Sequence, residues 1–380
     1  MHITYRKTTL GIVDWRNGLN RNLMECEQQV AELSMGIKPT IKEYDEDDWA
    51  DDTFGVGWAR KDTFLNNQRC LFKELINNPS SGFAFINSSG GIELNIRPAM
   101  TEMLKKCNQL GLNIALLCIC TPGQPPRISE FVDYRLVNGT MRGRNLFHDG
   151  NDIWLVNRRT KTETQVGHET FIPTKCYPRL SKLLEQYFLV IRPLEQELAY
   201  HVYGKQCSQI YSEYMWVKEG NKMTSKSMYK DLKVFLTKYC NVDGGIQIYR
   251  QLCVEIGRVF LGSEFEIFGD ELLSAQRGHS LRVERGQYAH ETHHLPAMSS
   301  DLLLQYGRIS EAWWGVLGLN SEIPPLLPLR QRNRSMANAR DELLAIIEPL
   351  RTDIKELHME LARMKEESFH HKEGSLSRLA

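Results

Sequence analysis

Residues 278–290 read Gly-His-Ser-Leu-Arg-Val-Glu-Arg-Gly-Gln-Tyr-Ala-His. The stretch brings His279, Arg282, Arg285 and Tyr288 together at spacings that a helix accommodates. A tyrosine side chain can attack as a covalent nucleophile. Because its ordinary pKa is about 10, at neutral pH it needs a nearby acid or base and positive charge. Both kinds of group are present here. The stretch therefore predicts either a site for covalent chemistry or a basic surface helix with a half-buried tyrosine.

The composition is that of an ordinary globular protein. The chain has 380 residues, of which 42% are hydrophobic and 25% charged, and this length predicts one large domain or two. Because the formal net charge is zero, nucleic-acid binding requires local clusters of basic residues. Nine scattered cysteines without Cys-x-x-Cys spacing argue against a disulfide framework or a zinc ribbon and indicate a reducing compartment. We expect no signal peptide and no membrane span, since no apolar run approaches ~20 residues.

Residues 1–97 predict a helical N-terminal region. Apolar residues recur at helical spacing from Trp15 to Leu33. An acidic run follows over residues 43–52, and we expect a solvated loop there. The alternative is a metal-dependent nuclease site, but carboxylates that bind catalytic Mg²⁺ normally come from separate elements. Residues 83–86 are a strand candidate.

The middle of the chain predicts helices and a small sheet. A helix over Pro98–Leu110 should end at Gly111, and the apolar run Ile114–Cys120 should form a second short helix or a buried strand. After a break at residues 121–126, Arg127 opens a further helix. Three alternating segments predict a small antiparallel sheet: Arg142–Phe147, Ile153–Val156 and Thr170–Pro173.

Further helices are predicted over residues 179–203, 224–239, 247–260 and 301–318. Pro193 should kink or split the first, and Thr224 should cap the second. The second helix carries Lys226, Lys230 and Lys233 about a turn apart, which predicts a stripe that contacts phosphates or a solvated face. From Leu343 to Met364 a heptad seam predicts a long helix, which packs on its own domain or joins a second chain.

Five residues with useful chemistry follow turns: Arg127, Lys161, Arg250, His279 and Tyr288. Two arginines can each hold a phosphate through paired hydrogen bonds, a lysine and a histidine can handle protons, and a tyrosine can attack. Fixed positive charge stabilises the charge that develops on the phosphate oxygens. The set is therefore typical of phosphoryl transfer without a metal.

These residues stand in an order that resembles the tyrosine recombinases, most of all the crypton-type recombinases of eukaryotic DNA transposons. Residues 124–130, Gln-Pro-Pro-Arg-Ile-Ser-Glu, resemble the box of the first arginine, and residues 144–161 resemble the hairpin with the catalytic lysine. Arg250 resembles the second arginine, and residues 278–288 match the final histidine–tyrosine box. Residues 308–313 look like the helix that follows. The resemblance covers about residues 98–320.

The resemblance implies a mainly α fold with a small antiparallel β-sheet (α+β). The recombinase-like catalytic domain would span residues 98–322, the helical region 1–97 would clamp DNA, and residues 323–380 would form a Pro-rich, basic spacer and the long C-terminal helix. Arg127 and Arg250 would clamp the scissile phosphate while Tyr288 attacks it. Lys161 would protonate the leaving oxygen, and His279 would help to take the tyrosine proton. Neither a metal nor a small-molecule cofactor is implied.

The chain departs from the family three residues before the second arginine. The family often has His or Lys there, and this chain has Gln247, which can donate a hydrogen bond but cannot act as a general acid. A shifted alignment would also put Arg158 or Arg159 in the place of Lys161. Three functions therefore stay open: a recombinase that integrates or transposes DNA, a captured recombinase that only binds DNA, and a structural coiled-coil adaptor. Should Tyr288 not be the nucleophile, Tyr249 is the next candidate.

The implied partners are double-stranded DNA and further copies of the chain, as a dimer or tetramer on paired DNA sites, in the nucleus. We expect His290, His293 and His294 to form a polar loop rather than a metal site. The residues expected to contact DNA are Arg142, Arg144, Arg158, Arg159, Lys226, Lys230, Arg277, Arg282 and Arg285.

Overall fold

A computed structural model describes most of the chain. It covers residues 1–41, 47–61, 71–75, 84–86, 92–94, 96–123, 125–150, 152–159, 170–262, 300–319 and 325–332, with residues 64, 77, 78 and 340. The chain divides into two compact units, Met1–Leu326 and Leu327–Ala380, and every element below belongs to the first. The heptad seam from Leu343 to Met364 lies outside the described residues. Among the described helices, none is both long enough and apolar enough to cross a membrane.

A hairpin and one long helix open the chain. Strands β1 (His2–Tyr5) and β2 (Thr8–Gly11) pair antiparallel and lead into α1 (Ile12–Leu33). The apolar residues at helical spacing form the buried face of α1, as predicted, and Trp15 donates from Nε1 to the Tyr249 hydroxyl at 3.1 Å. Gly18 lies so close to the Tyr239 carbonyl oxygen that a Cβ would overlap it. The first helix is thereby packed tightly against residues far along the chain.

The helix after the first hairpins is longer than predicted. Strands β3 (Ala84–Ile86) and β4 (Ile92–Leu94) pair antiparallel, and α3 (Ile96–Cys120) follows as one continuous helix. The prediction that Gly111 ends a helix is wrong, as is the alternative of a strand over Ile114–Cys120. A Cβ at Gly111 would overlap the Tyr187 hydroxyl, so the glycine lets the Tyr187 side chain pack directly against the backbone of α3.

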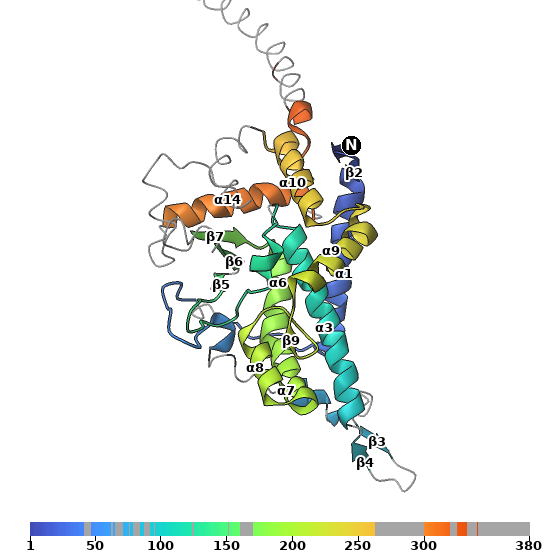
Figure 1. The fold of residues 1–380 in the computed structure, drawn as a ribbon, viewed down its shortest axis with the longest axis vertical. Helices are drawn as coiled ribbons and strands as arrows, with labels where there is room; N and C mark the ends of the chain where they lie inside the picture. Colours follow the sequence, from blue (N-terminus) through green and yellow to red (C-terminus); the bar gives the residue numbers. More distant parts are fainter. Residues whose placement is uncertain are drawn as a thin grey trace, which may run out of the picture. The chain divides into compact units, whose positions relative to one another are not determined.

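A three-stranded antiparallel sheet is present as predicted, although its first strand begins at Leu146 and not at Arg142. Its strands are β5 (Leu146–Asp149), β6 (Asp152–Arg159) and β7 (Thr170–Lys175), in the order β5-β6-β7. The long helix α14 (Ser300–Leu317), also predicted, packs against β7 beside this sheet (Figure 1). The sheet connects at its start to the short helix α4 (Ile128–Phe131), which opens directly after Arg127.

Pro193 marks the point where one predicted helix divides. Helix α6 (Pro178–Gln186) continues through a π-helical turn, η4 (Tyr187–Ile191), into α7 (Arg192–Tyr203). Pro193 stands in the first turn of α7, directly after the π-helical turn, where its missing N–H removes one helical hydrogen bond. Arg192 and Glu195 are buried together beside the Tyr187 hydroxyl, with Nε and Oε2 2.9 Å apart. Helix α8 (Lys205–Glu213) then packs against α7.

The helices predicted over residues 224–239 and 247–260 are both present, each within one residue of its predicted bounds. Strands β8 (Val217–Lys218) and β9 (Asn221–Lys222) form a hairpin, and α9 (Ser225–Cys240) begins where the Thr224 hydroxyl accepts from the Ser227 amide at 3.2 Å. Helix α10 (Ile246–Phe260) follows the predicted turn at Gly244 and Gly245. A single 3₁₀ turn, η1 (Trp58–Arg60), lies earlier in the chain.

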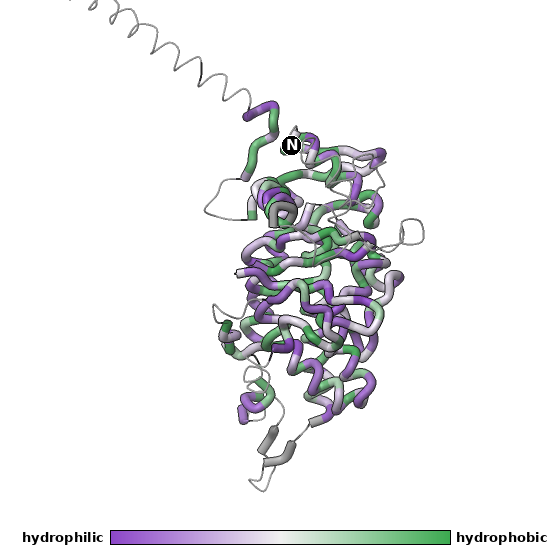
Figure 2. The backbone as a smooth tube through the Cα atoms, turned by 90° about the vertical axis from the view of Figure 1, so that its left-hand side faces the viewer, coloured by the Kyte–Doolittle hydropathy of each residue, from purple (hydrophilic) through white to green (hydrophobic). Residues whose placement is uncertain are grey.

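The unit is mainly helical with small antiparallel sheets, so the coarse α+β prediction is confirmed. Hydrophobic and hydrophilic segments alternate along the backbone, as expected for helices that each bury one face (Figure 2). One hydrophobic cluster includes residues from Ile3 to Leu319. The boundary predicted between residues 97 and 98 falls inside α3, and the chain divides into its two compact units after Leu326.

Candidate phosphate-binding site

Three arginines line one cavity of about 490 Å³, which we call the arginine pocket. They are Arg127, Arg142 and Arg158, and two carboxylates, Glu130 and Asp133, lie among them. Ser129, Gly143 and Asn145 complete the lining. The pocket combines an excess of positive charge with hydrogen-bond donors, which suits an anionic ligand such as a phosphate.

Arg127 directly precedes α4 and follows a turn at Gly123. Gly123 takes a left-handed conformation (φ +79°) and lies against the Trp313 ring, where a Cβ would not fit. The Arg127 carbonyl then accepts the first two helical bonds of α4, and its guanidinium Nη1 lies 3.3 Å from Oε1 of Glu130. The Arg-x-Ser-Glu spacing thus places the arginine and its carboxylate on neighbouring positions of one helical turn.

Glu130 is held in turn by a residue that sequence reasoning missed. The Asn157 side-chain nitrogen donates to Oε2 of Glu130 at 3.1 Å, and Asn157 is buried on β6. Both carboxylate oxygens therefore have a partner, one in Arg127 and one in Asn157. Nothing in the sequence around Asn157 indicates this role, because the contact joins two elements that the sheet brings together.

Arg250 lies close enough to Arg127 for each charge to act on the other. Burial first, and then the charge of Arg127, lower the pKa of Arg250, while Glu130 acts in the opposite direction. Helix α10 carries Arg250 half-buried, and Gln247 stands exposed one turn earlier on the same helix. The two arginines expected to hold one phosphate thus lie within electrostatic reach of each other, although Arg250 does not line the arginine pocket.

Arg158 and Arg142 complete the positive side of the pocket. Arg158 donates from Nε to the Arg144 carbonyl at 3.0 Å, and its guanidinium lies over the Phe171 ring at 4.8 Å. A Cβ at Gly143 would overlap the Arg158 guanidinium, so the glycine leaves space for it. Arg142 is about half exposed and pairs with Asp133 at 3.5 Å. Arg159 is the last residue of β6, opposite Thr170.

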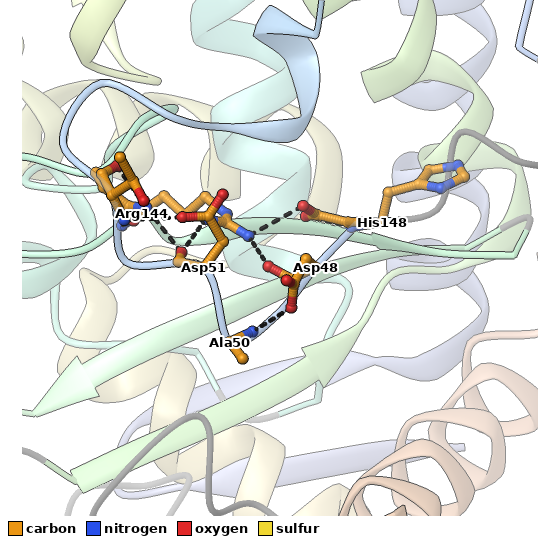
Figure 3. Close-up of polar contacts among 8 residues, drawn as sticks. Asp48, Ala50, Asp51, Arg144 and His148 are labelled. Carbon is orange, nitrogen blue, oxygen red and sulfur yellow. Dashed lines mark hydrogen bonds and ion pairs between the residues drawn. The ribbon is translucent and has the colours of Figure 1, made fainter.

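Arg144 does not belong to the pocket, and the prediction that it contacts DNA is wrong. Its side chain is 1% exposed and points toward the acidic segment of the N-terminal region (Figure 3). There it donates to the Asp51 carbonyl at 2.6 Å and to Oδ1 of Asp47 at 3.0 Å. The guanidinium is therefore an internal anchor, meaning that it attaches the acidic segment to the residues that precede β5.

The acidic run is correspondingly less solvated than predicted. Asp47 is 3% exposed and pairs with Arg144. Burial raises the pKa of the Asp47 carboxyl, and the charge of Arg144 offsets part of that rise. Trp49 stacks on Phe147 of β5 with ring centroids 4.6 Å apart. This part of the run is therefore attached to the sheet, while residues 42–46 lie outside the described part of the chain.

Helix α9 carries the three predicted lysines and lies beside α4 and α10, the helices associated with Arg127 and Arg250. Lys226, Lys230 and Lys233 are exposed on α9, which packs against both α4 and α10. Lys222, which sequence reasoning did not single out, bonds to Asp133 of the pocket and adds positive charge.

Tyr249 cannot serve as the alternative nucleophile. Its hydroxyl is buried, donates to the Cys120 carbonyl at 2.7 Å and accepts from Trp15. Burial raises the pKa of Tyr249 well above its usual range. The side chain is part of the core. The remaining predicted site residues lie outside the described residues: Lys161, Arg277, His279, Arg282, Arg285 and Tyr288.

No protein-family model matches the chain, and no solved structure matches it either.

Proposed function

We propose that the protein breaks and rejoins DNA strands through a covalent 3′-phosphotyrosyl intermediate, as a recombinase or transposase. The observation that carries the proposal is the arginine pocket, where Arg127 at the start of α4 lines one cavity with Arg142 and Arg158. The charge of Arg127 also reaches Arg250 of α10, whose pKa it lowers. Like charges repel, so holding them together is favourable where an anion binds between them. A backbone phosphate of DNA is such an anion.

The arrangement suits the charge that develops during phosphoryl transfer. Arginine donors held in place before the reaction stabilise the phosphate oxygens at no further cost in reorganisation. Glu130 and Asn157 hold Arg127 in one orientation, which is the kind of support that such a donor requires. The positive lining of the pocket would bind the phosphates on either side of the reacting one.

The reaction itself needs a nucleophile and two proton transfers. The Tyr288 oxygen would attack the phosphorus atom while its proton passes to His279, and the bond to the 5′ oxygen would break. Lys161 would give a proton to the leaving 5′ oxygen. The new phosphotyrosyl bond keeps the energy of the old phosphodiester, so a second 5′-hydroxyl can reverse the step on a new strand. We further propose that the enzyme acts in the nucleus, as a multimer on paired sites.

One observation favours a second candidate, a captured recombinase that binds DNA without cutting it. Gln247 stands exposed one turn before Arg250, where relatives often carry a proton-transferring side chain. A glutamine there can bind a phosphate oxygen and cannot protonate it.

A trapping experiment separates the two candidates. Binding sequences are selected from a pool of random duplexes, and the selected duplexes are nicked so that a cut releases a short fragment with a 5′-hydroxyl. A protein–DNA adduct that survives SDS supports the enzyme. Tight binding without an adduct, on the complete set of nick positions, supports the captured form, and absence of DNA binding overturns both.

A further inference from the structure

Two exposed apolar side chains stand on loops beside the arginine pocket. Met141 is 93% exposed, and Phe54 is 69% exposed. Met141 directly precedes Arg142, which lines the pocket together with Gly143. Among the large apolar side chains that the structure describes, these two are the most exposed, and both stand next to the cationic lining of the pocket.

The loop that carries Met141 is closed on itself and tied to its neighbour. The Gly139 amide donates to the Arg142 carbonyl at 2.8 Å, which leaves Thr140 and Met141 at the tip. Asn138 joins this loop to the one that carries Phe54: its amide donates to the Val56 carbonyl, and its carbonyl accepts from the Gly55 amide, both at 2.8 Å.

The Asn138 side chain strengthens the same junction. Its nitrogen donates to the carbonyls of Asp51 and Thr53, at 2.9 and 3.2 Å, and its oxygen accepts from the Arg144 amide at 3.0 Å. Buried Arg144 then donates to the Asp51 carbonyl from the other side. Met141 is therefore presented on a braced loop, and little conformational freedom remains to be lost when its side chain is covered.

We propose that Met141 is a wedge that separates base pairs of duplex DNA next to the phosphate held in the arginine pocket, with Phe54 on the adjoining loop packing against the same duplex. The inference rests on the proposed function. Apolar side chains of this kind enter between base steps of DNA and unstack them, while neighbouring arginines hold the phosphates and set the register.

Charge favours DNA over a protein as the occupant. Arg127, Arg142 and Arg158 outnumber the two carboxylates of the adjoining pocket, and Lys222 adds a further cation beside Asp133. The surroundings of Met141 therefore keep an excess of positive charge, which attracts a polyanion.

The test uses the full chain and a duplex selected from a random pool, with 2-aminopurine replacing single adenines along it. This base fluoresces more strongly when it is unstacked. We expect wild-type protein to raise the fluorescence at one or two adjacent positions. Met141→Ala should lose the rise, Phe54→Ala should reduce it, and both variants should still bind the duplex, because phosphate contacts carry most of the affinity. Met24→Ala, on an exposed position of α1, is the matched control and should behave as wild type.

The results that would overturn the role of Met141 differ from the result that would refute the proposed function. Full fluorescence with bound Met141→Ala and Phe54→Ala overturns the wedge, whether or not adducts form on nicked DNA. A change in the sedimentation of DNA-free Met141→Ala, with the fluorescence intact, also overturns it and identifies the pair as a contact between copies of the chain. Complete absence of DNA binding by wild-type protein refutes the proposed function as well.

Discussion

The Asn157 side-chain nitrogen lies 3.1 Å from Oε2 of Glu130, and the other oxygen of that carboxylate lies 3.3 Å from Arg127. Asn157 on β6 thus holds Glu130, and Glu130 in turn orients Arg127 at the start of α4. Asn157 is 7% exposed and does not line the arginine pocket, so it acts through Glu130 as a positioning residue.

Asn157→Leu should therefore impair the reaction more than binding. Loss of a hydrogen bond to a charged group costs about 1.5–3 kcal/mol, which corresponds to adduct formation slower by about 10- to 160-fold. DNA affinity should change little, because the phosphate-binding arginines remain. Single-turnover adduct formation and equilibrium binding measure the two effects. An equal loss in both, or a loss explained by unfolding in a thermal melt, would contradict a positioning role.

Arg144→Leu should destabilise the fold. The change leaves the Asp47 carboxylate buried without its partner, and breaking a buried ion pair in this way costs about 3–5 kcal/mol. Urea unfolding of the variant and of Arg142→Leu, whose side chain is half exposed, gives the comparison. A loss for Arg144→Leu no larger than for Arg142→Leu would show that the internal anchor contributes little.

The penalty of Arg144→Leu should shrink as the pH falls. Burial raises the pKa of Asp47, and without Arg144 this folded-state pKa rises further. A carboxyl whose pKa is higher in the folded state binds its proton more tightly there, so protonation favours folding. The difference in unfolding free energy between wild type and variant is thus expected to be largest at neutral pH and smaller once the pH falls below the variant's folded pKa. A penalty independent of pH would mean that Asp47 is not the group left unpaired.

Tyr249→Phe tests whether the core tyrosine has any part in the chemistry. We expect adduct formation to persist, since the hydroxyl is buried between Trp15 and Cys120. Stability should fall by about 1–3 kcal/mol, because a buried donor and a buried acceptor lose their partner. Loss of the adduct from a variant that still folds and binds DNA would return Tyr249 to the list of nucleophiles.

The exposed lysines of α9 should contribute to DNA affinity through salt-dependent contacts. Each phosphate contact adds about 0.9 to the slope of log affinity against log salt. Lys226→Ala and Lys230→Ala should each reduce the slope by about that amount, whereas Lys105→Ala, on an exposed position of α3, should not. If all three variants keep the wild-type slope, α9 is a solvated face, the alternative that its sequence pattern left open.

Much of the architecture could be predicted because its signals are local. Thr224 caps α9, Pro193 divides α6 from α7, and alternating residues form the three-stranded sheet, each for reasons that depend on a few neighbouring residues. Arg127 opens α4 for the same kind of reason.

The errors concern residues whose roles depend on distant partners. Gly111 looks like a helix end in sequence, but α3 continues through it, and the missing side chain leaves room for the Tyr187 hydroxyl. Arg144 looks like one more basic residue of a DNA-binding segment, yet Asp47 and the Asp51 carbonyl bury it. Asn157 carries no local signal at all, since its contact with Glu130 exists only after β6 and α4 have packed.

The most direct test of the account is to locate the covalent bond. Wild-type protein is trapped on a selected, nicked duplex and digested, and the peptide that retains the nucleotide is identified by mass spectrometry. We predict a phosphotyrosyl bond at Tyr288, and we predict that Tyr288→Phe binds the duplex with nearly wild-type affinity and forms no adduct, because only the attacking oxygen is lost. Adduct formation by Tyr288→Phe at the wild-type rate, or a nucleotide attached to another residue, would contradict the account.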